Sequence, residues 1–268
     1  MASNMPRKTQ VALDQYFPGA LTGAETEQTV YKTLAPMGFN ADNTLFADCS
    51  CPDEINHDDP EEDVSMLFQR RWGEVFPLSG LGGMPFVGKT GWAAMSSHVP
   101  VDGHILVLIG PHVGIDKDGN VGKVTRKGQH GSSSACGAAI GALAALEADR
   151  SAANFKNGYE DHQMDAIKHF LEPHVDELQE TDNKQAALAY KMYDIAMDFL
   201  ERIIHLNWMG NGSKLVIVGG IMINCDEEGS DRFLPLKFIS RTQTREVDHF
   251  RKAFGESQRP YIFEQTRQ

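Results

Sequence analysis

The sequence predicts a single α/β domain with a central, mostly parallel β-sheet flanked by helices. Short apolar stretches such as His104–Ile109 and Lys214–Asn224 have the length and β-branched content of buried strands. Longer stretches with apolar residues at helical spacing alternate with them, as in parallel sheets with helical crossovers. No segment of the 268 residues has the composition of a linker, so we expect one domain over residues 1–268.

The first half of the chain contains two predicted helices and one predicted strand. Thr22–Leu34 is expected to be a helix because a Thr-Gly turn opens it and Pro36 follows its end. Thr44–Asp48 is a short strand that leads into a cysteine-containing turn. Glu61–Arg71 has acids in its first turn and two arginines at its end, which suits the helix dipole. The glycine-rich stretch Phe76–Gly91 is predicted to be a loop.

The second half begins with the most apolar strand. His104–Ile109 lies between an Asp-Gly turn and a Gly-Pro stop, both of which favour chain reversal. Serines precede a run of small apolar residues, which predicts a capped and buried helix over Ser132–Asp149. The remaining predictions are a turn at Asp118–Gly119 into Val121–Thr125, helices at His162–Glu180 and Asn183–Met209, a strand at Phe233–Ser240 and a loose polar end.

The composition argues against two classes of partner. The formal net charge is −12 at pH 7, whereas nucleic-acid binding depends on clustered lysine and arginine. An anionic membrane surface would also repel this chain. The longest apolar runs, Ile105–Ile109 and Leu215–Ile223, are too short to span a bilayer. We therefore expect neither nucleic acid nor membrane as a partner, and Met1–Gln10 shows no targeting segment.

Three potential zinc ligands stand where strands end or a helix begins. Cys51 follows the first predicted strand, His112 follows the most apolar strand, and Cys136 lies in the first turn of the predicted helix after Ser132–Ser134. These positions converge at the carboxyl edge of a parallel sheet, and a helix N-terminus favours a thiolate. Two thiolates and one imidazole form a three-ligand site with an open fourth position, as in catalytic zinc centres.

Spacing alone leaves other interpretations open. Cys49 lies two residues before Cys51 and on the same side of an extended chain, so either could be the ligand. His98 is a rival to His112. Gly83–Thr90 also matches the phosphate-loop expression G-x-x-x-x-G-K-[ST], which would indicate an NTPase. The context disfavours that interpretation, because no buried strand precedes the match and its proline removes one N–H donor.

Five motifs follow one another along the chain: Cys51–Asn56, Gly83–Gly91, His98–Pro100, Gly110–Ile115 and Ser134–Gly137. Together they resemble the limiting-CO2-inducible protein B family of algae and diatoms, also called theta-class carbonic anhydrases. The resemblance covers roughly Met37–Leu146. It implies a fold similar to the β-class carbonic anhydrases, a homodimer, and a place in the carbon-concentrating mechanism of a plastid.

The resemblance implies zinc-dependent reversible hydration of CO2 to bicarbonate, in which zinc acidifies its bound water and the hydroxide attacks CO2. Cys51-Pro-Asp53 matches the Cys-x-Asp of the β-class, which favours Cys51 over Cys49. Asp53 would then either accept the hydrogen of that water or bind zinc and close the site. The alternative function is a non-catalytic zinc-binding member that acts as a partner in a complex.

An arginine would hold Asp53 away from the metal through a charge-assisted pair. In the β-class this arginine follows the aspartate closely, and the sequence offers Arg70, Arg71 and, farther away, Arg126. We predict Asp53 and Arg71 as the catalytic pair, with Arg126 as the substitute.

Overall fold

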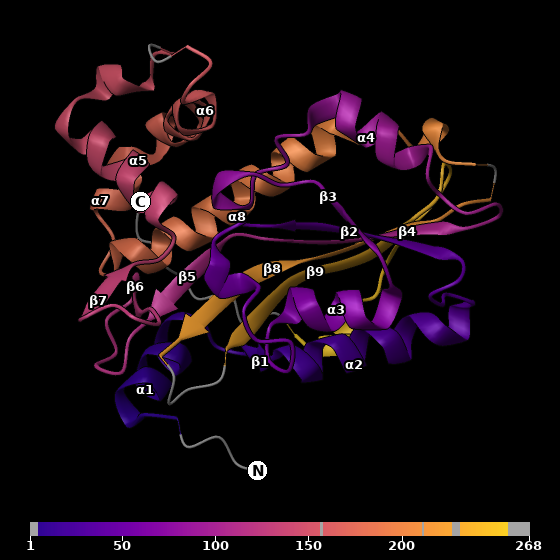
Figure 1. Cartoon of the computed structure of the whole chain (residues 1–268), viewed down its shortest axis with the longest axis horizontal. Helices are drawn as coiled ribbons and strands as arrows, with labels where there is room; N and C mark the ends of the chain where they lie inside the picture. The colour runs from indigo at the N-terminus through magenta and orange to yellow at the C-terminus, as the bar shows by residue number, and fades with distance from the viewer. Residues whose placement is uncertain (1–4, 156–157, 211, 227–230, 257–268) are drawn as a thin grey trace.

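The computed structural model describes residues 5–155, 158–210, 212–226 and 231–256. Within these residues, its centre is an eight-stranded sheet (Figure 1). The strand order is β1 (Leu21–Thr22), β9 (Arg232–Arg241), β8 (Leu215–Cys225), β4 (His104–Gly110), β2 (Thr44–Ser50) and β3 (Val75–Pro77), with β10 (Glu246–Asp248) on β9 and β5 (His112–Ile115) on β8.

The middle of the sheet is parallel and one side of it is antiparallel. The pairs β3–β2, β2–β4 and β4–β8 are parallel, and β5 is parallel to β8. β9 reverses direction and pairs antiparallel with β8, β1 and β10. The predicted α/β class with a central, mostly parallel sheet flanked by helices is therefore confirmed.

Helices cover both faces of the sheet, as Figure 1 shows. The alternation along β4 explains why: Leu106 and Leu108 join the core under α2, α3 and α9, whereas Ile105, Val107 and Ile109 face the opposite core. Burying each such side chain stabilises the fold by about 1.5–3 kcal/mol. The helices are α1 (Arg7–Tyr16), α2 (Gly23–Leu34), α3 (Val64–Trp72), α4 (Gly88–Ser96), α5 (Gly137–Ala148), α6 (His162–Leu171), α7 (Val175–Gln179), α8 (Lys184–Ile203) and α9 (Phe250–Phe254).

Two predicted helices differ from the observed ones. The helix predicted from Ser132 begins at Gly137, because Ser132–Ser134 forms strand β7 and pairs with β6 (Lys123–Thr125) in a small separate sheet. The predicted helix over His162–Glu180 is two helices, α6 and α7. Pro173 lies in the 3₁₀ turn between them, where its ring and missing N–H prevent a continuous α-helix.

The glycine-rich stretch predicted as loop contains the end of β3 and the start of α4. The predicted Thr22 start is confirmed, since its side chain accepts a hydrogen bond from the Glu25 backbone in a capping box. The predicted loose end falls on 257–268, outside the described residues. No helix in the described ranges is long and apolar enough to cross a membrane.

The extended segment that contains β4 and β5 is not one continuous strand, because β4 ends at Gly110 and β5 begins after Pro111. Both strands pair with β8, which meets β4 through Leu215–Gly219 and β5 through Met222–Cys225. A bulge at Gly219/Gly220 in β8 lies opposite the interruption. The backbones come so close there that a Cβ on Gly110 would lie 2.6 Å from the Gly220 carbonyl oxygen. His112 is the first residue of the resumed strand.

Candidate metal centre

The ends of two strands and the start of one helix meet at the carboxyl edge of the sheet. Cys51 follows β2, His112 opens β5, and Cys136 is the N-cap residue of α5. All three are buried, and one ligand atom from each lies within 4.8 Å of the others. The structure thus brings together the three residues that the sequence predicts as ligands.

The geometry of this group suits a zinc ion. The Cys51 and Cys136 sulfurs are 3.9 Å apart, close to the roughly 3.8 Å expected for two thiolates about 2.3 Å from one tetrahedral ion. His112 Nε2 is buried and, within the described ranges, has no hydrogen-bond partner. Leaving such an atom unpaired costs about 1–3 kcal/mol, a cost that a bound metal would remove. The three residues could therefore hold a metal and leave one position open.

Cys51 and Cys136 differ in acidity. Their mutual hydrogen bond, with burial as a second cause, raises the pKa of the Cys51 thiol. The same hydrogen bond lowers the pKa of Cys136, and the backbone N–H groups of Ala138 and Ala139 at the start of α5 lower it further against the effect of burial. Cys136 is therefore the more acidic thiol, as expected at a helix N-terminus.

Asp53 lies beside His112. Its Oδ2 is 3.5 Å from His112 Nε2 and 2.8 Å from Arg126 Nη2. Burial opposes ionisation of Asp53, but its charged neighbours, His112 and Arg126 among them, hold its pKa below the usual value. Asp53 Oδ1 is buried and lacks a hydrogen-bond partner among the described residues. This oxygen is free to accept a hydrogen bond from a water or to meet a cation.

The predicted pairing of Asp53 with Arg71 is wrong. Arg71 Nε lies 2.6 Å from Glu27 Oε1, and the other arginine of α3, Arg70, pairs with Glu61 at 2.7 Å. Arg71 reaches Glu27 because α3 packs against α2 on the face of the sheet that holds the smaller core, whereas Arg70 pairs with a residue in the turn just before α3. Arg70 and Arg71 are closer to Asp53 in sequence than Arg126 is, but neither forms an ion pair with it.

Arg126, named in the sequence analysis as the substitute, makes the pair instead. It follows β6, and the β6–β7 hairpin lies against β5. Its guanidinium also contacts Glu54 at 3.0 Å and donates to Ser133 Oγ at 2.5 Å and to the Ser134 carbonyl oxygen at 3.0 Å. These contacts fix the guanidinium and, through it, the Asp53 carboxylate.

The rival ligands lie outside the group. Cys49 is fully buried, and its thiol donates to the Gly83 carbonyl oxygen at 3.4 Å. Burial raises the pKa of this thiol well above its usual range. His98 is exposed after α4 and lies against the Phe76 ring, with centroids 5.7 Å apart. Neither residue belongs to the cluster of close ligand atoms.

The structure contradicts the phosphate-loop interpretation of Gly83–Thr90. The N–H groups that would cradle a phosphate are used internally: those of Met84, Phe86, Val87 and Gly88 donate to carbonyl oxygens between residues 78 and 85. Lys89 and Thr90 lie exposed on α4. The segment lacks the free backbone donors on which phosphate binding of this kind depends.

Asn224, a buried residue of β8, is not among the site residues predicted from the sequence. Its Oδ1 lies 2.8 Å from His112 Nδ1, on the side of the ring away from the sulfurs. The signal was present in the sequence, because Asn224 is the single amide side chain in the otherwise apolar strand Leu215–Cys225. A buried polar side chain in such a strand needs a partner, and here the partner is a candidate ligand.

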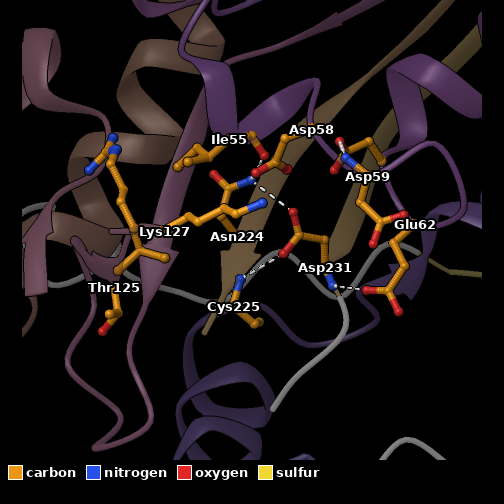
Figure 2. A pocket seen from close by; sticks show the side chains of 12 residues that line it. Ile55, Asp58, Asp59, Glu62, Thr125, Lys127, Asn224, Cys225 and Asp231 are labelled. Atoms are coloured by element: carbon orange, nitrogen blue, oxygen red, sulfur yellow. Dashed lines mark hydrogen bonds between the residues drawn. The ribbon is translucent and has the colours of Figure 1, made fainter. Parts of the chain in front are cut away.

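A cavity of about 320 Å³ lies beyond Asn224 (Figure 2). Its wall is mostly acidic, with Asp58, Asp59, Glu62, Asp63 and Asp231, and Arg126 and Lys127 also line it. Burial raises the pKa of Asp63 to about 6 and that of Asp231 to about 7. Figure 2 shows Asp231 between Asn224 and Glu62, with the Cys225 N–H donating to its carboxylate at 2.8 Å.

The family model for limiting CO2-inducible proteins B/C beta carbonic anhydrases matches residues 20–242. The crystal structure of PtLCIB4, described as a homolog of the limiting CO2-inducible protein LCIB, is 32% identical, with a TM-score of 0.83 over 90% of this chain and 99% of its own. The structure of LCIB is 20% identical, with a TM-score of 0.66 over 87% of this chain and 95% of its own, a likeness that concerns the fold. The curated proteins give no match.

The family match covers most of the chain, including Cys51, His112 and Cys136, and the PtLCIB4 likeness covers nearly the whole of that protein. The prediction from the motifs between Met37 and Leu146 is therefore confirmed over a longer range than those motifs span. The chain belongs to the family of limiting CO2-inducible proteins B/C beta carbonic anhydrases.

Proposed function

We propose that this protein catalyses the reversible hydration of CO2 to bicarbonate with a zinc ion held by Cys51, His112 and Cys136. One observation carries the proposal: two buried sulfurs 3.9 Å apart face a buried imidazole nitrogen that lacks a partner among the described residues. Bound there, zinc supplies a Lewis acid that makes a water acidic enough to act as a nucleophile near neutral pH.

Asp53 orients the attacking water. Arg126 engages Oδ2, which leaves Oδ1 available to accept a hydrogen bond. A water that donates one hydrogen to this oxygen has a lone pair free to attack CO2. Because Arg126 is itself held by Glu54 and Ser133, Asp53 is kept from turning toward the ligands and closing the open position.

CO2 is small and apolar, so its binding requires an apolar wall beside the reacting groups. A small buried cluster of Ile55, Val124 and Ala135 meets this requirement. Each member is next to, or two residues from, a residue of the site: Asp53, Arg126 and Cys136 respectively. We assign this cluster to CO2 binding because apolar contacts hold CO2 without competing for the polar groups that orient the water.

The test is oxygen-isotope exchange between CO2 and water, measured on zinc-loaded protein beside a Cys51→Ala control. We expect exchange in the wild-type protein and its loss in the control. Full zinc occupancy without exchange over a wide pH range would contradict catalysis and support the alternative of a non-catalytic zinc-binding partner. In that alternative Asp53 binds the metal, a movement that is short because Oδ2 already lies 3.5 Å from His112 Nε2.

The family resemblance also supports a homodimer and a plastid location in an alga or diatom, as part of a carbon-concentrating mechanism. We expect sedimentation equilibrium to give twice the chain mass of 29.6 kDa. A monomer at micromolar concentration would contradict the dimer. A fluorescent fusion of the full gene product, imaged against chlorophyll, tests the location separately.

A further inference from the structure

Asn224 supports His112 from the side of the ring opposite the sulfurs. The His112 Nδ1 to Asn224 Oδ1 distance is 2.8 Å, and both residues are almost fully buried. They lie on adjacent parallel strands, with His112 opposite Met222 and Gly114 opposite Asn224 in the β5–β8 register. The sheet register therefore places the two side chains within hydrogen-bonding distance of each other.

Three acceptors fix the orientation of the Asn224 amide. Its Nδ2 donates to the Ile55 carbonyl oxygen at 3.2 Å, to Asn56 Oδ1 at 3.2 Å and to Asp231 Oδ2 at 2.9 Å (the last is drawn in Figure 2). A flipped amide would place its oxygen against a carbonyl and a carboxylate, which is repulsive. The amide oxygen must therefore face His112, and Nδ1 of the ring must be the donor.

The same network reaches a second candidate ligand. Asn56 accepts from Asn224 through Oδ1 and donates through Nδ2 to the Cys51 carbonyl oxygen at 3.1 Å. Asn224 is thus linked to His112 through the ring and to Cys51 through Asn56. Asp231 anchors the amide from the cavity side, with its Oδ1 held by the Cys225 N–H.

We propose that Asn224 is a positioning residue for the metal centre, which fixes the neutral His112 ring with its proton on Nδ1. The lone pair of Nε2 is then directed at the space shared with Cys51 and Cys136. This inference rests on the proposed function, because the Nδ1-protonated tautomer affects the protein's activity only if Nε2 of His112 binds a metal. Partners that orient a ligating histidine in this way contribute about 10- to 100-fold to metal affinity.

Zinc affinity, measured by competition with a chromophoric chelator, is the first test. We expect Asn224→Leu, which keeps the branched shape but removes the acceptor, to bind zinc about 10- to 100-fold more weakly than the wild type. Ser240→Ala is the matched control, because it removes a buried hydrogen bond to another histidine, the 2.8 Å contact with His249 Nε2. The control should bind zinc like the wild type. Equal zinc affinity in a folded Asn224→Leu protein would overturn the inference.

The ring tautomer provides a test that requires neither metal nor variant. Nitrogen-15 NMR of the metal-free wild-type protein, at a pH where the His112 ring is neutral, should show the remaining ring proton on Nδ1. A proton on Nε2 would overturn the inference even if Asn224→Leu fails to fold. If the wild type binds no zinc, the proposed function fails, and the tautomer then tests only whether Asn224 orients the His112 ring.

Discussion

At the scale of single residues, Arg126 contacts the Asp53 carboxylate at 2.8 Å, and we expect this pair to hold Asp53 in place. We predict that Arg126→Ala lowers CO2 hydration about 10- to 100-fold while leaving zinc content unchanged, because the released Asp53 can turn toward the metal. Isotope exchange measures the predicted loss of CO2 hydration, and metal analysis of the same sample measures the zinc content. Undiminished turnover in this variant would remove Arg126 from the role.

Arg71→Ala is the matched control for Arg126→Ala. Arg71 pairs with the nearly buried Glu27 rather than with Asp53, so its removal should cost about 1 kcal/mol of stability and leave turnover at the wild-type level. The two variants delete the same side chain from different ion pairs. A loss of activity limited to Arg126→Ala would assign the effect to the Asp53 pair rather than to the loss of a positive charge.

Asp63 makes stability depend on pH. Its pKa is raised from 3.8 to about 6 by burial first, with the charges of Asp58 and Asp59 adding to it. The folded protein therefore binds more protons than the unfolded chain between about pH 4 and 6, and stability falls as pH rises through that window. We predict that Asp63→Asn, whose amide oxygen can still accept from the Asp59 N–H, is about 1 kcal/mol more stable than wild type at pH 8 after allowing for solvent screening.

Urea unfolding at pH 5 and pH 8 measures this difference. The gain should shrink at pH 5, where the wild-type carboxyl is mostly protonated in the fold. Asp118→Asn is the control, because Lys8 lowers the pKa of that exposed carboxyl. The control should show no gain at pH 8. An Asp63→Asn protein with the same stability difference at both pH values would contradict the pKa assignment.

At the scale of the elements, the contact between β4 and β8 tolerates no side chain at Gly110. A Cβ there would lie 2.6 Å from the Gly220 carbonyl oxygen, which belongs to the backbone and cannot move aside. We predict that Gly110→Ala costs about 1–3 kcal/mol in urea unfolding. Gly141→Ala, on the exposed side of α5 with no atom within 4 Å of the added Cβ, should instead be neutral or stabilising by up to about 1 kcal/mol.

The elements were predicted best where local chemistry determines them. The Thr22 capping box and the apolar run of β4 identify their elements without tertiary information. The start of α5 was misplaced because Ser132–Ser134 satisfies its backbone by pairing with Lys123–Thr125, a contact that serine content alone does not reveal. The same hairpin explains why Arg126 was ranked below Arg71, since its approach to Asp53 depends on where that hairpin packs.

At the scale of the whole molecule, metal binding and folding should be linked. The predicted ligands come from β2, β5 and α5, which meet only in the folded protein. At zinc concentrations 100-fold above the dissociation constant, the ion should stabilise the fold by about 2.7 kcal/mol and raise Tm by about 5–10 °C. Calorimetry with and without chelator measures this shift.

Two cysteine variants separate the ligand from its rival. Cys51→Ala should abolish the zinc-dependent rise in Tm, whereas Cys49→Ala should keep it, although the loss of a buried thiol lowers the starting Tm. The thiol of Cys49 is directed to the Gly83 carbonyl oxygen rather than to the other ligands. A zinc response that survives in Cys51→Ala and disappears in Cys49→Ala would reverse the assignment.

The long strand β8 has a consequence for how the protein is made. It pairs with both β4 and β5, and it carries the amide that contacts His112. During synthesis Cys51, His112 and Cys136 leave the ribosome well before Asn224 does, so the three proposed ligands lack their contact with β8 until that strand emerges. We therefore expect the centre to be completed only when β8 inserts beside β4 and β5.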